Sequence, residues 1–128
     1  MSTRIDRCAA LLRALGDRAP ALSAAQLEQA LADWDLVDVG GAVVMIRGAE
    51  MHVGAAPEAR GRWFGAAVRA LLCDVLARHG RIETVVMKDH QIGHAFARRL
   101  GFEQVGEGGA VTRYELRTLR HAKPHRTA

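Results

Sequence analysis

Long hydrophobic runs are missing from this sequence. Its longest apolar stretch, residues 40–46, is far shorter than the about 20 residues that a membrane-spanning helix needs. Residues 1–15 interleave acidic and basic side chains and contain no apolar block followed by a small-residue cleavage site, so they do not resemble a signal peptide. We therefore expect a cytoplasmic protein that does not bind a membrane.

Cysteine is also scarce, with two residues in the chain. Cys8 and Cys73 each lie among Ala and Leu at helical spacing, which predicts buried, reduced thiols rather than a disulfide or a catalytic thiol. Common catalytic signatures are absent as well: there is no GxSxG elbow, no GxxxxGK(S/T) phosphate loop and no CxxC pair. The sole tyrosine, Tyr114, lies on a predicted strand, and we interpret it as a packing residue.

The composition that remains is that of an ordinary globular protein, with 49% hydrophobic and 25% charged residues in 128. This length fits one domain with a real core, which we assign to residues 1–119. Residues 1–112 contain 13 basic and 13 acidic residues, so the net charge of +4 arises beyond them. We interpret residues 120–128 as a flexible basic tail. Contact with nucleic acid or an acidic partner is the less favoured alternative, because it rests on charge alone.

The first part of the chain predicts two helices. A helix is expected over residues 3–15, because five apolar residues share one face: Ile5, Cys8, Leu11, Leu12 and Leu15. Ser23 and Gln26 have the spacing of a capping box and predict a second helix that ends near Asp33.

Three strands are expected next, over residues 34–39, 42–47 and 50–55, with glycine-containing turns between them. A long helix over residues 61–79 should follow, closed by Gly80. Its buried face would hold Phe64, Val68, Leu71, Leu72, Val75 and Leu76.

The C-terminal part predicts a strand over residues 82–87, which should be parallel to residues 50–55 because a helix separates the two strands. A shorter helix over residues 90–100 would bury Ile92, Phe96 and Leu100, and Gly101 would cap it in a left-handed conformation. Two final strands, 103–107 and 111–119, complete the order ααβββαβαββ. The predicted class is α/β, with helices packed on a mixed sheet.

Two motifs separated by one strand resemble those of the GNAT acetyltransferase superfamily. The family's loop, Gln/Arg-x-x-Gly-x-Gly/Ala between a strand and a long helix, is matched by residues 60–65, Arg-Gly-Arg-Trp-Phe-Gly. The family's Ala-x-x-Leu-Tyr-x-Lys-x-Gly-Phe helix end is matched by Gly93, Phe96, Arg99, Gly101 and Phe102. The resemblance covers residues 34–119 and implies a twisted mixed sheet in which the two parallel strands splay apart.

The resemblance implies that the loop holds the pyrophosphate of acetyl-CoA. A helix N-terminus suits this role, because it presents unpaired N–H groups and a partial positive charge. Gly61 and Gly65 would let the backbone approach the phosphates, and Arg60 and Arg62 would add charged donors. An ordinary helix start with two surface arginines is the alternative. The complete set of cofactor-binding candidates is Val53, Ala55, Arg60, Gly61, Arg62, Phe64, Gly65, Ala66, His90, Gly93 and Phe96.

Acetyl transfer also needs a base for the acceptor amine. Glu50 and His52 are two residues apart on the strand that lines the cofactor cleft in this family, so they share a face and are the candidates. A Glu and a His satisfied by hydrogen bonds at a sheet edge are the alternative. Many members carry a catalytic tyrosine where this chain has Ala97. His90 and His94 lack a third ligand at a suitable spacing, so we expect no metal.

The implied function is that of an acetyl-CoA-dependent N-acetyltransferase whose acceptor amine the sequence does not identify. Three departures set the chain apart: the missing opening strand, Trp63 in place of the middle loop glycine, and Ala97. The shortened plan and the Arg-Gly-Arg-Trp loop resemble the small GNAT-like proteins of tailed phages. The alternative function is therefore a catalytically weak or inactive GNAT-fold protein that serves as a virion-associated or partner-binding module.

Overall fold

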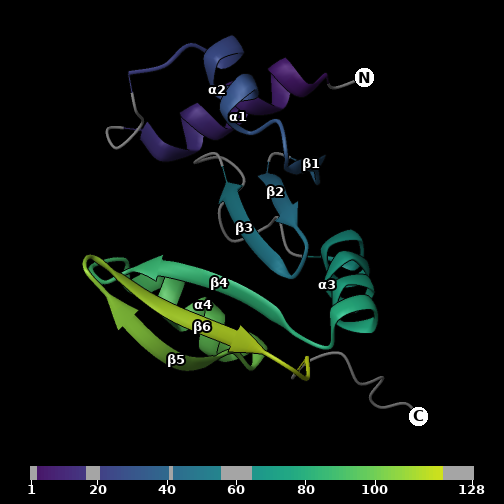
Figure 1. Cartoon of the computed structure of the whole chain (residues 1–128), viewed down its shortest axis with the longest axis vertical. Coiled ribbons are helices and arrows are strands. Elements are labelled where there is room, and N and C mark those ends of the chain that lie inside the picture. Colours follow the sequence, from purple (N-terminus) through teal and green to yellow (C-terminus); the bar gives the residue numbers. More distant parts are fainter. Residues whose placement is uncertain (1–2, 17–20, 41, 56–64, 120–128) are drawn as a thin grey trace. The chain divides into compact units, whose positions relative to one another are not determined.

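The computed structural model describes residues 3–16, 21–40, 42–55 and 65–119. Within these ranges the helices and strands follow in the order ααβββαβαββ, which confirms the predicted fold class (Figure 1). The chain divides into two compact units, residues 1–47 with 51–68 and residues 48–50 with 69–128, and each is described by itself. Among the described residues, no helix combines the length and the apolar character that crossing a bilayer requires.

Both helices of the N-terminal unit, α1 (Arg4–Leu15) and α2 (Ala24–Ala30), begin with a capping box. At α2 the hydroxyl of Ser23 accepts the Gln26 N–H at 3.1 Å, and the Gln26 side chain accepts the Ser23 N–H at 2.8 Å, as predicted. Thr3 and Asp6 exchange the same two bonds at α1, which the sequence analysis did not predict. The second helix ends at Ala30, before the predicted end near Asp33.

The buried face of α1 is narrower than the apolar pattern predicted. Cys8, Leu11 and Ala14 are buried, whereas Ile5 and Leu15 are 43% and 41% exposed. The reason is that a helix lying on a small sheet touches it along one line, and residues at the margins of the stripe remain in solvent.

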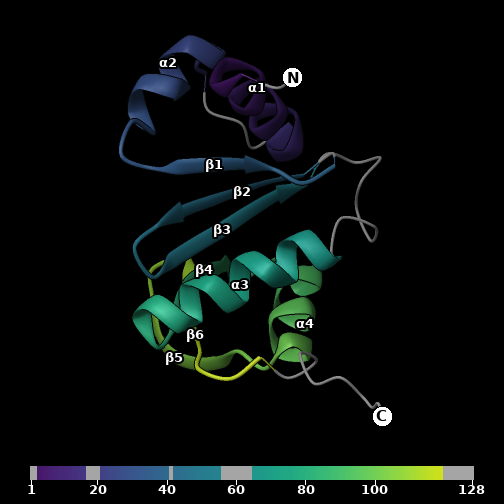
Figure 2. The ribbon, with the colours of Figure 1, turned by 90° about the vertical axis from the view of Figure 1, so that its right-hand side faces the viewer.

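This helix packs against an antiparallel hairpin made by β1 (Asp35–Asp38) and β2 (Ala42–Arg47). Figure 2 shows α1 and α2 on the same side of the hairpin. A small core joins the helix to the strands, formed by Cys8, Leu11, Leu36 and Val43. The hairpin confirms the predicted strand pair, although β1 is shorter than the predicted 34–39.

Next, β3 (Glu50–Ala55) has the predicted bounds. Gly54 on this strand faces α1, because a Cβ built there would lie 2.7 Å from Leu11 Cδ2 and 3.4 Å from Ala14 Cβ. The close approach of helix and strand therefore depends on the missing side chain.

Helix α3 (Ala66–His79) begins later than predicted. Gly65 lies in a bend before it, in keeping with the poor helix propensity of glycine, and residues 61–64 lie outside the described residues. Val68, Leu72 and Val75 are buried as predicted. The prediction that Cys73 is buried was wrong, since this residue is exposed. Cys73 follows the buried Leu72 directly, so it lies off the buried face of the helix.

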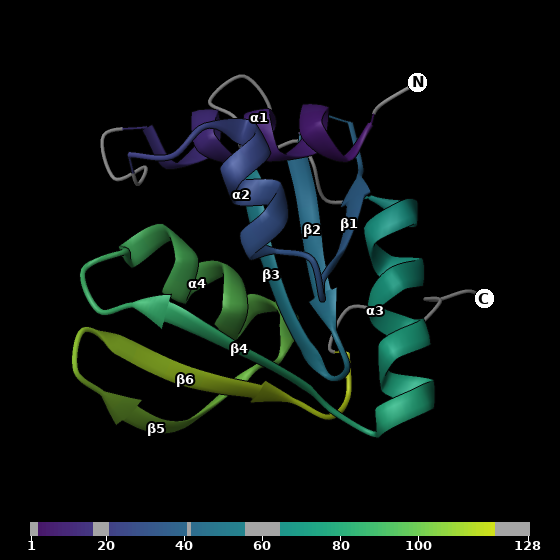
Figure 3. The same cartoon turned by 45° about the horizontal axis from the view of Figure 1, so that its top comes forward.

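The C-terminal unit contains β4 (Ile82–Met87), α4 (Gln91–Leu100), β5 (Glu103–Gly108) and β6 (Val111–Leu116). Strand β6 lies between β4 and β5 and is antiparallel to both. Strand β3 runs parallel to β4, with Glu50 opposite Glu83, which confirms the predicted parallel neighbours. The hydrogen-bonded order is β1-β2-β3-β4-β6-β5. Figure 3 shows α4 beside β4, on which it packs.

The buried face of α4 differs from the predicted one. Ile92 is 78% exposed, and the buried residues are His94, Ala97 and Leu100. The helix ends as predicted at Gly101, whose φ of 108° is left-handed. The Phe102 N–H then donates to the Ala97 carbonyl at 3.0 Å, and the Phe102 ring is buried.

Candidate active site

His52, one of the two predicted bases, lies in a stack of three side chains from separate segments of the N-terminal unit. Its ring centroid is 5.5 Å from that of Trp34, with the planes tilted by 54°. The guanidinium carbon of Arg47, at the end of β2, lies 4.3 Å from the centroid of the Trp34 ring. A cation over an indole face is attracted by the ring quadrupole. The candidate base therefore lies beside an aromatic ring that also carries an arginine against its face.

Trp34 is held in place by Arg4 of α1. The Arg4 guanidinium donates to the Trp34 carbonyl at 2.9 Å and to the Leu31 carbonyl at 2.8 Å. It also forms an ion pair with Glu28 at 3.3 Å. One planar, multidentate donor thus fixes the end of α2 and the segment that carries Trp34. Sequence analysis identified neither Trp34 nor Arg47 as a neighbour of His52.

Glu50, the other predicted base, belongs to the C-terminal unit and begins a row of glutamates across four strands. Glu50 is paired with Glu83 on β4. Glu115 on β6 lies between the next two members of the row, because it is paired with Glu83 on one side and with Glu103 on β5 on the other. Directly opposed residues project to the same face of a sheet, and like charges there repel. Arg81 reduces this repulsion, with its Nε 2.7 Å from Glu83 and 3.7 Å from Glu115.

Two of the predicted cofactor residues, His90 and Gly93, meet at the start of α4. His90 occupies the N-cap position without a side-chain cap, and its N–H donates to the Met87 carbonyl at 2.9 Å. A Cβ on Gly93 would lie 2.6 Å from His90 Nδ1 and 2.9 Å from Val86 Cγ1. Gly93 therefore lets α4 approach β4 closely, which gives this mid-helix glycine a packing reason. Phe96 is half-buried on the same helix.

His94 and Tyr114 form a buried polar pair that sequence analysis did not identify. His94 is 7% exposed and Tyr114 1%. His94 Nε2 lies 2.9 Å from the Met87 carbonyl oxygen, so this nitrogen carries the proton, since a carbonyl only accepts. In the neutral ring Nδ1 then accepts the Tyr114 hydroxyl proton at 2.7 Å. The signal in the sequence was the three-residue spacing from His94 to Ala97 and Leu100, which places all three on one helix face.

These bonds occupy both ring nitrogens of His94, so His90 and His94 do not present a pair of metal ligands. Across the described ranges, no group of three or more His, Cys, Asp or Glu side chains is arranged to hold a metal ion.

The remaining cofactor candidates are placed only in part. Arg60, Gly61, Arg62 and Phe64 lie outside the described residues. Gly65 and Ala66 are exposed at the start of α3, and a Cβ on Gly65 would meet none of the described atoms within 4 Å. On β3, Val53 is 40% exposed and Ala55 is half-buried.

Ala97, where the resemblance expects a tyrosine, is 5% exposed and packs in the buried face of α4. No side-chain acid is therefore available at this position.

Comparison with solved structures bears on the architecture. PH1933 from Pyrococcus horikoshii OT3 superimposes with a TM-score of 0.66 at 12% identity, over 92% of this chain and 93% of that one. The PaiA N-acetyltransferase from Thermoplasma acidophilum, in complex with coenzyme A, superimposes with a TM-score of 0.60 at 13% identity. The match covers 92% of this chain and 97% of that one. An acetyltransferase of the GNAT family from Streptococcus pneumoniae has a TM-score of 0.58 at 13% identity. The match covers 90% of this chain and 96% of that one.

The chain has the GNAT fold. No family model matches the sequence, and no curated protein matches it in sequence. The likeness therefore concerns the fold.

Proposed function

We propose that this chain is an acetyl-CoA-dependent N-acetyltransferase that transfers an acetyl group to an amine. The observation that carries the proposal is the GNAT fold, found in a chain whose sequence has the family's Arg-Gly loop at residues 60–65. Residues 1–119 would act as one functional domain, with residues 120–128 as a basic tail.

Acetyl-CoA would supply an activated acyl carbon as a thioester. The start of α3 fits its pyrophosphate, because Gly65 and Ala66 are exposed there and the first turn of a helix has unpaired N–H groups. Arg60 and Arg62 would add charged donors in the preceding loop. Val53, Ala55, His90, Gly93 and Phe96 would line the rest of the cofactor site.

The chain's own residues would have to remove a proton from the acceptor. An amine with a pKa of about 10.4 is roughly 3.4 units from neutrality at pH 7, a cost of about 4.6 kcal/mol. In our proposal Glu50 or His52 takes the ammonium proton, and the neutral amine nitrogen then bonds to the thioester carbonyl carbon. As the carbon–sulfur bond breaks, the nitrogen releases its second proton to water, and the thiolate leaves with the electron pair and takes a proton from water.

The surroundings of the two bases support an amine acceptor. The four carboxylates of the glutamate row that starts at Glu50, partly offset by Arg81 and Arg117, favour a protonated amine over an anion. Beside His52, the Trp34 ring offers an apolar surface on which an acceptor can pack.

Ala97 argues for slow turnover. Without a side-chain acid the CoA sulfur must leave as an unprotonated thiolate. Such a leaving group is still usable near neutral pH, because an ordinary thiol has a pKa of about 8.5. Loss of one general acid typically lowers the rate by about 10²- to 10⁴-fold. The same buried alanine favours a second candidate function, a GNAT-fold partner-binding module without turnover. Under that alternative the resemblance to short phage proteins suggests a virion location, and under the first a cytoplasmic one.

A thiol-release assay with acetyl-CoA and a panel of small amines and proteins tests the two candidates. We expect slow release that falls at least about tenfold in Glu50→Gln or His52→Ala. Release that survives both changes would contradict this assignment of the bases. Saturable binding of CoA without release on any acceptor would favour the binding module.

A further inference from the structure

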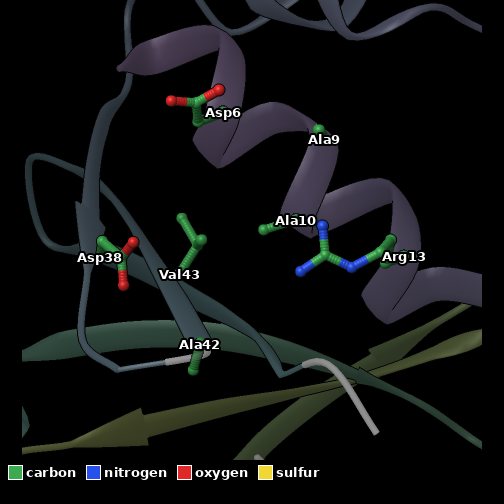
Figure 4. A pocket seen from close by; sticks show the side chains of 7 residues that line it. All are labelled: Asp6, Ala9, Ala10, Arg13, Asp38, Ala42 and Val43. Atoms are coloured by element: carbon green, nitrogen blue, oxygen red, sulfur yellow. The ribbon is translucent and has the colours of Figure 1, made fainter. Parts of the chain in front are cut away.

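A groove in the N-terminal unit lies between α1 and residues of β1 and β2 (Figure 4). Its volume is about 320 Å³. That size is at the lower end of small-molecule sites, about 300–1,000 Å³, and far exceeds the about 30 Å³ of one water. The described residues that line it belong to this one unit.

Small side chains create the groove. Ala9 and Ala10 of α1 and Ala42 at the start of β2 are among its lining residues, and larger side chains at the two helix positions would occupy part of this space. Asp6 and Arg13 flank the two alanines on the same helix face, because positions three, four and seven residues apart line one side of a helix. They are about 10 Å apart along the helix axis at 1.5 Å per residue.

The charges around the groove are arranged by sign. In Figure 4, Asp6 and Asp38 lie toward one side, and the Arg13 guanidinium on the other side points back toward Ala10. Each carboxylate uses one oxygen locally: Asp6 accepts the Thr3 N–H at 3.1 Å and Asp38 the Gly40 N–H at 3.0 Å. Their second oxygens have no ion-pair partner among the described residues, and neither does Arg13.

The Asp6 carboxylate is ionised at neutral pH. Its hydrogen bonds with the Thr3 backbone and side chain hold its pKa below the ordinary value. The groove therefore presents two negative charges and one positive charge around an apolar alanine floor.

We propose that this groove binds a free basic amino acid of the size of lysine or arginine. Its two cationic groups would pair with Asp6 and Asp38, and its carboxylate would pair with Arg13 in the planar geometry that guanidinium favours. A diamine would leave Arg13 unused, and a dicarboxylate would be repelled by both aspartates. The proposal goes beyond the acetyl transfer proposed above and does not depend on it.

Calorimetric titration of the full chain with L-lysine, L-arginine, cadaverine and L-glutamate tests the proposal. We expect saturable binding of the two basic amino acids, weaker binding of cadaverine and none of glutamate. Arg13→Gln should weaken lysine binding at least about tenfold without weakening cadaverine binding, because only the amino acid has a carboxylate that pairs with Arg13. Arg78→Gln is the matched control, since it removes another exposed helix arginine that lies outside the groove.

A second variant separates a groove site from charge attraction elsewhere. Ala9→Leu should fill the groove while keeping the helix, because leucine is a strong helix former. We expect it to abolish lysine binding with an unchanged circular dichroism spectrum. No saturable binding of lysine or arginine to the wild-type chain would overturn the proposal, as would unchanged lysine binding in folded Ala9→Leu.

Discussion

The buried pair of His94 and Tyr114 makes a quantitative prediction about stability. Tyr114→Phe removes the hydroxyl that donates to His94 Nδ1 at 2.7 Å and leaves that nitrogen without a donor. His94→Leu removes the acceptor instead and leaves the hydroxyl of Tyr114 unpaired at 1% exposure. The Met87 carbonyl keeps a partner in either variant, because it also accepts the His90 N–H.

The magnitude follows from the cost of a buried polar group without a partner. Each single substitution should lower the free energy of unfolding by about 1–3 kcal/mol. In the double variant two apolar groups face each other and neither polar atom is left alone. We therefore expect it to cost at least about 1 kcal/mol less than the sum of the singles.

The wild-type chain, the two single variants and the double variant form a double-mutant cycle. Urea denaturation of the full chain, followed by circular dichroism and fluorescence, measures the free energy of unfolding of all four proteins. Coincident transitions from the two probes would justify a two-state treatment. The control cycle pairs Tyr114→Phe with His79→Leu, an exposed histidine at the end of α3, and should be additive. Additivity within about 0.5 kcal/mol in the His94 cycle as well would refute the assigned hydrogen bond.

Three further changes test other parts of the structure. Gly54→Ala should lower the free energy of unfolding by about 1–3 kcal/mol in urea titrations, because its Cβ would lie 2.7 Å from a leucine methyl of α1; an unchanged stability would contradict the close packing. Asp6→Asn should destabilise the chain more at pH 7 than at pH 2 in urea titrations, and an equal loss at both pH values would contradict the charged hydrogen bond from the Thr3 N–H. The folded pKa of Asp6 is depressed below its ordinary 3.8, so its contribution is present above about pH 4 and lost as pH falls through the lowered value. Arg60→Ala with Arg62→Ala should weaken CoA binding in calorimetry by about 2–4 kcal/mol, and unchanged affinity in the folded variant would remove the loop from the cofactor site.

The strands were predictable because two signals in the sequence indicate them, the hydrophobic pattern of each segment and the turn residues at its ends. Residues 42–47, 50–55 and 82–87 are apolar or alternating segments, and glycine or another turn residue bounds each of them. Local chemistry also specified two helix ends, the Ser23 capping box and the left-handed Gly101. Such signals act within a few residues, so no knowledge of tertiary packing is needed to interpret them.

The helix faces were less predictable, because the sequence does not specify whether an apolar residue at the margin of a stripe is buried or exposed. Ile92 fits a four-residue spacing with Phe96 and Leu100, yet it is 78% exposed. The buried face is centred instead on Ala97 and includes His94. A histidine can be buried there because Tyr114 and a backbone carbonyl satisfy both of its nitrogens, and those partners come from distant segments.

In the candidate site, too, the local structure was predictable and the tertiary contacts were not. The strand that carries Glu50 and His52 was predicted with its bounds. The stack of Trp34 and Arg47 beside His52 was not, because three segments must fold together to form it.

Product analysis tests the central claim most directly. The full chain is incubated with acetyl-CoA and an amine panel, and the acceptors are examined by mass spectrometry, with His52→Ala and Glu50→Gln in parallel. We expect an acetylated amine that accumulates with the wild-type chain and at least about tenfold more slowly with one of the two variants. Failure of the wild-type chain to acetylate any acceptor under conditions where it binds CoA would contradict the central claim.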